Sequence, residues 1–252
     1  AKNPTYGTVD AVKNFSREDV VNYYSTHYIP NNMIISVVGN VSNVKENVGK
    51  YFGSLKPGKA IKRSYVDEPL QTKAKKFVEK KKTLNSYMVL GYKTVPWKHK
   101  DSYVFDVISA VLGRGQSGWM FNEIRNKRGL AYQVGVNVED EYNYGTFAVF
   151  AGLDRKKITK AKEIMLQQFR RLQKLAKKDL EEAKTYIEGN HTLQMEDNFQ
   201  QTDNLSVWES LGDVKLAGTY LSNIRKVTVN DVKRVAKKYF NDKYTLVVIE
   251  QE

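Results

Sequence analysis

The residues of this chain with the clearest potential for chemistry are an arginine and a tyrosine with six residues between them, Arg125 and Tyr132. Arginine offers a fixed fork of hydrogen-bond donors, and tyrosine offers one donor without bringing a charge. When the two converge on one point, they suit a peptide carbonyl and favour the oxyanion of a tetrahedral intermediate, where one donor is worth about 3–4 kcal/mol. The spacing alone is equally compatible with a surface arginine and a tyrosine packed beneath it.

The sequence around this pair predicts the local structure that would bring it together. Gly113–Gly118 reads GRGQSG, and its glycines let the backbone turn tightly into a helix that we expect over Ser117–Arg128. Gly129 is expected to end that helix as the residue just beyond its C-cap. Tyr132 then leaves at a new angle and lies near Arg125.

Two other arginines and a phosphate site are alternative interpretations of the same segment. Arg128 competes for the role of the arginine, but its place beside Gly129 fits a capping role at the helix C-terminus better. Arg114 is expected to be a loop residue. The Gly-rich turn is not a G-x-x-x-x-G-K-[ST] motif and follows a helix instead of a strand, which makes a phosphate cradle a weak interpretation.

None of the three histidines, His27, His99 and His191, has the spacing of a metal site. A helix-borne zinc site needs a second histidine or a carboxylate three or four residues further on, and the H-x-x-E-H motif is absent. We expect His27 to be a packing residue at a helix end, His99 to be exposed to solvent, and His191 to lie on a polar helix. The sequence also lacks a G-x-S-x-G elbow with a histidine partner. We therefore expect no metal and no catalytic residue on this chain.

The chain is strongly basic, with 41 Lys and Arg against 28 Asp and Glu and a formal net charge of +13. Such a balance permits nucleic acids or acidic peptides as partners. The lysines, however, interleave with apolar residues at strand or helix period, as in 73–82 and 156–162, which is typical of a solvated surface. No nucleic-acid-binding motif accompanies them, so we expect no nucleic-acid partner.

The composition also bounds the class of protein and its compartment. With 252 residues, 41% of them hydrophobic, the chain can bury a sizeable core. It has no cysteine, which excludes disulfides, thiolate zinc sites and cysteine nucleophiles. No run approaches the ~20 apolar residues of a membrane helix, and the N-terminus lacks a targeting pattern and an initiator Met. We expect a processed or truncated chain in the cytoplasm, without a membrane partner.

An internal repeat indicates the domain organisation. A helix expected from the cap Ser16 leads to the apolar run Met33–Val38, and a helix expected from the cap Thr228 leads to the run Tyr244–Ile249. In both helices an aspartate three residues after the cap completes the signature of a helix start. We expect each apolar run to be a buried strand, and two copies of one domain that each close with this unit.

Between the two copies, hydrophobic periods and turn signals predict an α+β fold, with helices packed on one face of a mainly antiparallel sheet. Gly212 is expected to stop a helix, and Asp154 to cap a long helix that continues to Ala176. The expected strands are Lys75–Lys82, Ser86–Lys93, Gln133–Asp140 and Gly145–Gly152. The expected helices are Asp101–Leu112, Ser117–Arg128, Asp154–Ala176, Asp179–Met195 and Phe199–Leu211.

These elements place the expected domain boundaries. Residues 1–55 hold the closing helix–strand–helix part of a preceding domain, residues 56–66 a linker with a Pro-Gly pair, and residues 67–252 a complete C-terminal domain. In this arrangement Met33–Val38 has no sheet of its own, and an isolated strand leaves its edges unpaired. We therefore expect that the upstream part was removed or that another chain supplies it.

The segment Val111–Val134, VLGRGQSGWMFNEIRNKRGLAYQV, closely resembles the signature in the C-terminal half of pitrilysin/insulinase-type (M16) zinc peptidases and their non-catalytic partner subunits. Phe15–Gly39 resembles the closing unit of the domain before it. The resemblance implies an M16-like metalloprotease domain in which Arg125 and Tyr132 hold the substrate at the scissile bond. It also implies two halves of two similar domains each, which close around an unfolded peptide that adds as a strand to a sheet edge.

In that family the zinc, its H-x-x-E-H motif and the general-base Glu belong to the first domain of one half, and the Arg–Tyr pair belongs to the last domain of the other. The resemblance therefore implies a chain that binds a peptide or unfolded polypeptide and is inactive alone. Zinc is expected on an H-x-x-E-H-bearing half, upstream in the same polypeptide or on a separate subunit of a homo- or heterodimer. The alternative is a non-catalytic structural or assembly subunit of the same fold, but the intact Arg125 and Tyr132 favour the first interpretation.

Overall fold

The computed structural model describes residues 5–61, 65 and 69–252, which form two compact units. The first unit contains residues up to 65 together with Asn198–Val214. The second contains the described residues between 66 and 197, followed by Lys215–Glu252. The domain division expected from the sequence placed 198–214 with the last domain, and that division stays a prediction.

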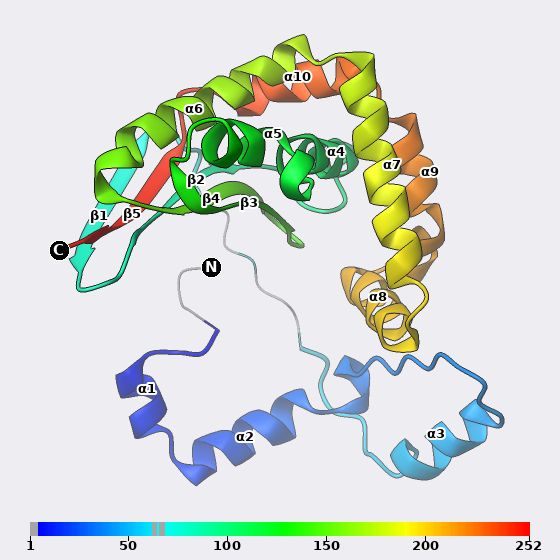
Figure 1. Cartoon of the computed structure of the whole chain (residues 1–252). Helices are drawn as coiled ribbons and strands as arrows, with labels where there is room; N and C mark the ends of the chain where they lie inside the picture. The colour runs from blue at the N-terminus through cyan, green and yellow to red at the C-terminus, as the bar shows by residue number, and fades with distance from the viewer. Residues whose placement is uncertain (1–4, 62–64, 66–68) are drawn as a thin grey trace. The chain divides into compact units, whose positions relative to one another are not determined.

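The second unit is built on one sheet of five strands (Figure 1). They are β1 (Lys75–Lys81), β2 (Ser86–Lys93), β3 (Ala131–Asp140), β4 (Gly145–Leu153) and β5 (Thr245–Gln251). Their order is β1-β5-β2-β4-β3; β1 and β5 pair in parallel, and the other neighbours are antiparallel. The expected α+β fold with a mainly antiparallel sheet is thereby confirmed.

The helices of this unit gather on one face of the sheet, as Figure 1 shows. Over the sheet lie α4 (Ser102–Gly113), α5 (Trp119–Phe121), α6 (Ile158–Arg171) and α10 (Val229–Tyr239). Beside α4 pack α7 (Lys177–Gln194) and α9 (Tyr220–Lys226). Short turns connect them: η2 (Gly115–Ser117), η3 (Asn122–Asn126), η4 (Arg155–Lys157), η5 (Leu172–Lys174) and η6 (Val214–Thr219), the last of which begins in the first unit. Among the residues described, no helix is both long and apolar enough to cross a membrane.

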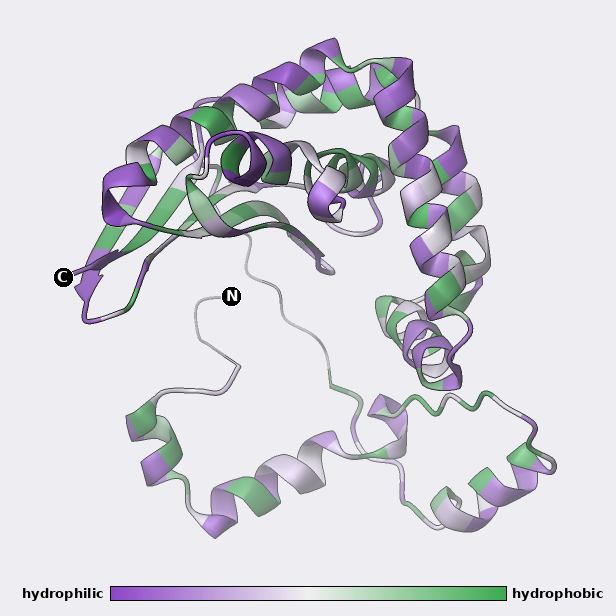
Figure 2. Cartoon of the chain, in the orientation of Figure 1, coloured by the Kyte–Doolittle hydropathy of each residue, from purple (hydrophilic) through white to green (hydrophobic). Residues whose placement is uncertain are grey.

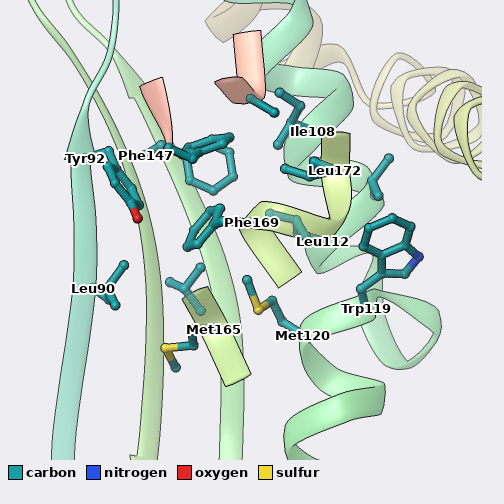
Figure 3. Packing of buried hydrophobic residues seen from close by; sticks show 14 of the residues in the cluster. Leu90, Tyr92, Ile108, Leu112, Trp119, Met120, Phe147, Met165, Phe169 and Leu172 are labelled. Carbon is teal, nitrogen blue, oxygen red and sulfur yellow. The ribbon is translucent and has the colours of Figure 1, made fainter. Parts of the chain in front are cut away.

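The core between helices and sheet is dominated by aromatic rings (Figure 3). Phe169 and Phe240 lie with ring centroids 4.5 Å apart, and Phe147 meets both rings at 5.8 and 5.1 Å. Such pairs add roughly 0.5–1.5 kcal/mol each beyond the burial of their area. Figure 2 shows the corresponding pattern of hydropathy, with hydrophobic residues in the strands and in α4 and hydrophilic residues along the outer helices.

The first unit consists of α1 (Val9–Asn14), α2 (Arg17–His27), η1 (Pro30–Asn32), α3 (Val44–Phe52) and α8 (Asn198–Leu211). The expected cap at Ser16 is confirmed, because its hydroxyl accepts from the Asp19 amide at 3.1 Å while the Asp19 carboxylate accepts from the Ser16 amide at 2.9 Å. Gly212 ends α8 as expected, with a φ of 107° that favours glycine.

Two expectations are wrong. Met33–Val38 is not a strand but lies without regular structure, and the side chains of Ile34, Ile35 and Val37 are 43–44% exposed. The physical reason is that no described strand borders it, so its backbone has no ladder partner. The long helix also stops early: α6 gives way to η5, and Ala176 is an exposed residue at the start of α7.

Candidate functional site

Arg125 lies on a helix that changes type as it approaches its end. The α-helical turn of α5 passes directly into η3, which is a π-helical turn. Its signature is the bond from the Lys127 amide to the carbonyl of Asn122, five residues earlier, at 2.9 Å. Single π turns within helices are rare and are frequent at functional sites. The helix expected over 117–128 therefore exists, but it begins at Trp119 and is widened where it carries Arg125.

Gly129 ends this helix and turns the chain toward β3, as expected. Its φ is 56°, in the left-handed region, and its amide donates to the carbonyl of Arg125 at 2.9 Å. This is the usual geometry of a helix that stops at glycine. The ammonium of Lys157 then donates to the Gly129 carbonyl at 2.9 Å, which fixes the turn from the side of η4.

Tyr132 is placed by an irregularity in β3. Ala131 pairs with Leu153 and Gln133 pairs with Gly152, so Tyr132 is the extra residue of a β-bulge. Bulges redirect side chains and are common beside active sites. The Tyr132 side chain is 65% exposed, which rules out the interpretation of a tyrosine packed beneath the helix.

Arg125 is exposed and held from one side only. Its guanidinium carbon lies 5.0 Å from the centroid of the Phe121 ring, one helical turn earlier. A cation over an aromatic ring is stabilised without any of its N–H donors being used. In the part of the chain that the structure describes, no carboxylate or carbonyl accepts from Arg125, and no hydrogen bond joins it to Tyr132. Both side chains thus stand on the two sides of the Gly129 turn with their donors free.

Arg128, the competing arginine, is committed elsewhere. It binds the side chain of Glu123 and donates to the Glu123 carbonyl at 2.8 Å. Glu123 also accepts from Lys127 at 2.7 Å; this hydrogen bond, together with the bond from Arg128, holds the pKa of the Glu123 carboxyl below its ordinary value. Arg128 therefore has the structural role at the helix end that its position indicated, and Arg125 is the arginine that remains available.

The Gly-rich turn supports the helix from its other end. A side chain at Gly118 would come within 2.7 Å of the Leu112 carbonyl oxygen, so only glycine allows this close approach. Arg114 lies in the bend between α4 and η2, as expected for a loop residue, but it is only 7% exposed and forms an ion pair with Glu182 on α7. The start of the helix is therefore fixed to α4 and α7 and not free to move independently.

Sequence reasoning missed Phe121 and Lys157 as parts of this region. Phe121 had a usable signal, because an aromatic residue four positions before an arginine on a helix lies on the same face. Lys157 had none, since its contact with Gly129 joins segments far apart in the sequence.

The histidines do not form a metal site in the described part of the chain. His27 stacks on Tyr23 at 3.8 Å, His99 accepts from the Asp101 amide at 3.0 Å, and His191 lies 5.7 Å from the Tyr220 ring. Among the described residues, no three His, Asp or Glu side chains are grouped so that they could hold a metal ion. The donor set that zinc requires is therefore not provided by these residues.

Comparison with known proteins agrees with this arrangement. Residues 14–187 match the sequence profile of the Peptidase M16 inactive domain. The zinc protease PqqE of Helicobacter pylori is 32% identical over 255 residues, which cover 96% of this chain and 56% of that protein. The uncharacterized zinc protease YmxG of Bacillus subtilis is 26% identical over 251 residues, covering 98% of this chain and 60% of that protein. The crystal structure of a protease from Helicobacter pylori matches with a TM-score of 0.90 and 29% identity, over 97% of this chain and 61% of that chain. The chain thus spans about three-fifths of the length of these relatives.

Proposed function

We propose that this chain, which belongs to the peptidase M16 family as its C-terminal inactive domain, holds the peptide substrate of a zinc endopeptidase whose metal site lies outside it. The observation that carries the proposal is the pair Arg125 and Tyr132, both exposed, neither hydrogen-bonded to the other, and set on the two sides of one fixed turn. The names of the relatives as zinc proteases support the reaction class. Because the described residues do not fit zinc, we assign no metal chemistry to them.

The two side chains are suited to a peptide carbonyl for different reasons. Within the described ranges of the chain Arg125 has no carboxylate partner, so its positive charge is available for an oxygen that gains negative charge. Tyr132 adds a neutral donor from the opposite side of the Gly129 turn. Phe121 beneath the guanidinium and Lys157 on the turn restrict the geometry before a substrate arrives, which lowers the ordering cost of binding.

The proposed partner is a half or subunit that bears the H-x-x-E-H motif, assembled with this chain as a homo- or heterodimer or joined to it in one polypeptide. The span of the relatives beyond this chain supports such a larger assembly. The proposed substrate is a peptide or unfolded polypeptide, because a folded protein does not present its carbonyls to two surface side chains in this way.

A second candidate function is a structural or assembly subunit with the same fold. The description of the matching family as an inactive domain favours it, since that description assigns no chemistry to the domain itself. The two candidates differ in whether Arg125 and Tyr132 are needed for peptide hydrolysis.

The test is peptide cleavage in the presence of zinc. It compares this chain alone, this chain mixed with the H-x-x-E-H half from the same source, and mixtures that carry Arg125→Ala or Tyr132→Phe. Matched controls are Arg17→Ala, an exposed arginine on α2, and Tyr186→Phe, an exposed tyrosine on α7. We expect activity only in the mixture, with a loss of at least about 100-fold in the two site variants and little change in the controls. Unchanged activity in the site variants selects the structural subunit.

A further inference from the structure

The described helices of the second unit lie over one face of its sheet (Figure 1). The opposite face carries exposed apolar side chains. Along β2, Met88, Leu90 and Tyr92 are buried beneath the helices, while the alternate residues Tyr87 and Val89 are 46% and 39% exposed. Successive side chains of a strand point to opposite faces, so the exposed set defines the uncovered face.

Strand register aligns the exposed apolar residues into one row across this face. Val89 pairs with Val247 on one side and with Phe150 on the other. Phe77 pairs with Val247, at the far end of the row. We call Phe77, Val247, Val89 and Phe150 the apolar row. Phe77 and Val247 are 56% and 42% exposed, which is unusual for large apolar side chains in adjacent positions.

The row ends beside the candidate site. Phe150 is paired with Gly135 on β3, and its ring lies where a side chain at Gly135 would be, 2.2 Å from the ideal Cβ position. In the neighbouring row, Tyr132 and Gln133 together oppose Gly152 at the bulge, and both are exposed. Gln133 therefore shares the face of the apolar row, and the exposed Tyr132 lies directly beside it in the bulge.

The charges at the other end of the row are mainly positive. β1 reads KKFVEKK, and Lys75 and Lys81 alternate with Phe77 and Glu79 toward the uncovered face. Glu79 is paired with Lys81 at 3.2 Å, which leaves the charge of Lys75 on the uncovered face of β1. With a formal net charge of +13 for the chain, this edge is complementary to a peptide that carries acidic residues.

We infer that the apolar row binds the substrate away from the scissile bond, and that its occupant is an extended acidic peptide with apolar side chains at alternate positions. The four strands that carry the row lie about 4.8 Å apart, so the row is roughly 14 Å long, the length of about four extended residues. Two alternate side chains of such an extended segment would lie on the row. The inference rests on the proposed function and names the substrate class of the same site.

The test measures binding without cleavage. A fluorescein-labelled acidic peptide with Val or Leu at alternate positions, and a second peptide with Ser at those positions, are titrated with the whole chain and followed by anisotropy. The variant is Val89→Thr combined with Val247→Thr, because threonine keeps the shape and strand preference of valine while it removes apolar surface. The matched control is Val78→Thr. Val78 is 45% exposed, but it pairs with Val248 on the opposite face of the sheet.

We expect the apolar peptide to bind the double variant about tenfold more weakly than it binds the wild type. It should bind Val78→Thr as tightly as the wild type, and the serine peptide should bind the wild type more weakly than the apolar peptide does. Equal binding of the two peptides, or equal binding to wild type and the double variant, overturns the inference. So does a wild-type self-association in sedimentation that the double variant abolishes, because the row would then be an interface between copies. Since no zinc half is present, these outcomes do not depend on the cleavage test of Arg125 and Tyr132.

Discussion

In α2 and α10 this chain builds the same helix twice. Both have 11 residues, and both begin with a reciprocal cap in which a hydroxyl and an aspartate bind each other's amides. Both also end alike, at Tyr28 with φ −90° and ψ 62° and at Phe240 with φ −90° and ψ 69°. Local sequence is sufficient to specify such a helix, because its caps and its hydrogen bonds lie within one segment.

The segments that follow these two helices differ completely. Thr245–Gln251 becomes β5, a central strand with β1 on one side and β2 on the other, and Leu246 is 3% exposed. Met33–Val38 has no strand beside it among the residues that the structure describes, and Ile34 is 43% exposed. The difference teaches that an apolar run records a preference for a strand, while the strand itself exists only where neighbours complete its hydrogen bonds.

Truncation of one apolar residue in each segment gives the largest expected contrast. Leu246→Ala should lower the free energy of unfolding by about 3 kcal/mol, because it leaves a cavity in a closed core. Ile34→Ala should lower it by less than about 1 kcal/mol, because that side chain is already exposed. Urea denaturation followed by circular dichroism measures both. Similar losses in the two variants would mean that Met33–Val38 is packed as a core strand after all.

Two aspartates give the next contrast, because the pKa of Asp140 in the second unit and the pKa of Asp19 in α2 are shifted in opposite directions. Burial, followed by the nearby charge of Asp106, raises the pKa of Asp140 to about 7, whereas the hydrogen bond from Ser16 lowers the pKa of Asp19. Between about pH 4 and 7, Asp140 is ionised in the unfolded chain but still protonated in the folded chain. The free energy of unfolding that Asp140 contributes therefore falls as pH rises through this range.

Asp140→Asn should therefore raise the melting temperature at pH 8 and leave it unchanged near pH 4. The expected rise is only a few degrees, because Asp140 is half-buried and solvent screens its charge. Differential scanning calorimetry at the two pH values measures it. An equal shift at both would show that the effect comes from packing and not from ionisation.

The helix caps give the smallest contrast, because α2 and α10 begin with the same kind of cap. Ser16→Ala and Thr228→Ala should each cost about 1 kcal/mol of helix stability. In α10 the buried residues Val232, Val235 and Ala236 should keep the helix formed, while α2, which buries no residue, should fray at its start. Amide exchange of the first turn of each helix measures this, and equal exchange in the two variants would contradict the assigned role of packing.

Local features of the fold followed from the sequence. The bounds of β2, the caps at Ser16 and Thr228, and the stop at Gly129 were all predicted, because each is written in consecutive residues. The insertion of β5 between β1 and β2 was not predicted, since pairing between distant segments leaves no local pattern.

The candidate site divides in the same way. Arg125 and Tyr132 were predicted from their glycine frame and the family resemblance, and the expected contact of Arg128 at the helix end is confirmed. The π turn and the bulge were not found, because each depends on which distant carbonyl or strand an amide meets. The role of Arg125 and Tyr132 in peptide binding stays a prediction until the cleavage test is made.

The parallel pair of β1 and β5 has a consequence for synthesis of the protein. Lys75 pairs with Thr245, so nearly the whole unit must be translated after β1 before its neighbour exists. At a rate of roughly 5–20 residues per second, β1 waits unpaired for roughly 10–30 seconds. Its four lysines keep the nascent strand soluble during that interval, because charge on an open edge opposes pairing with the wrong chain.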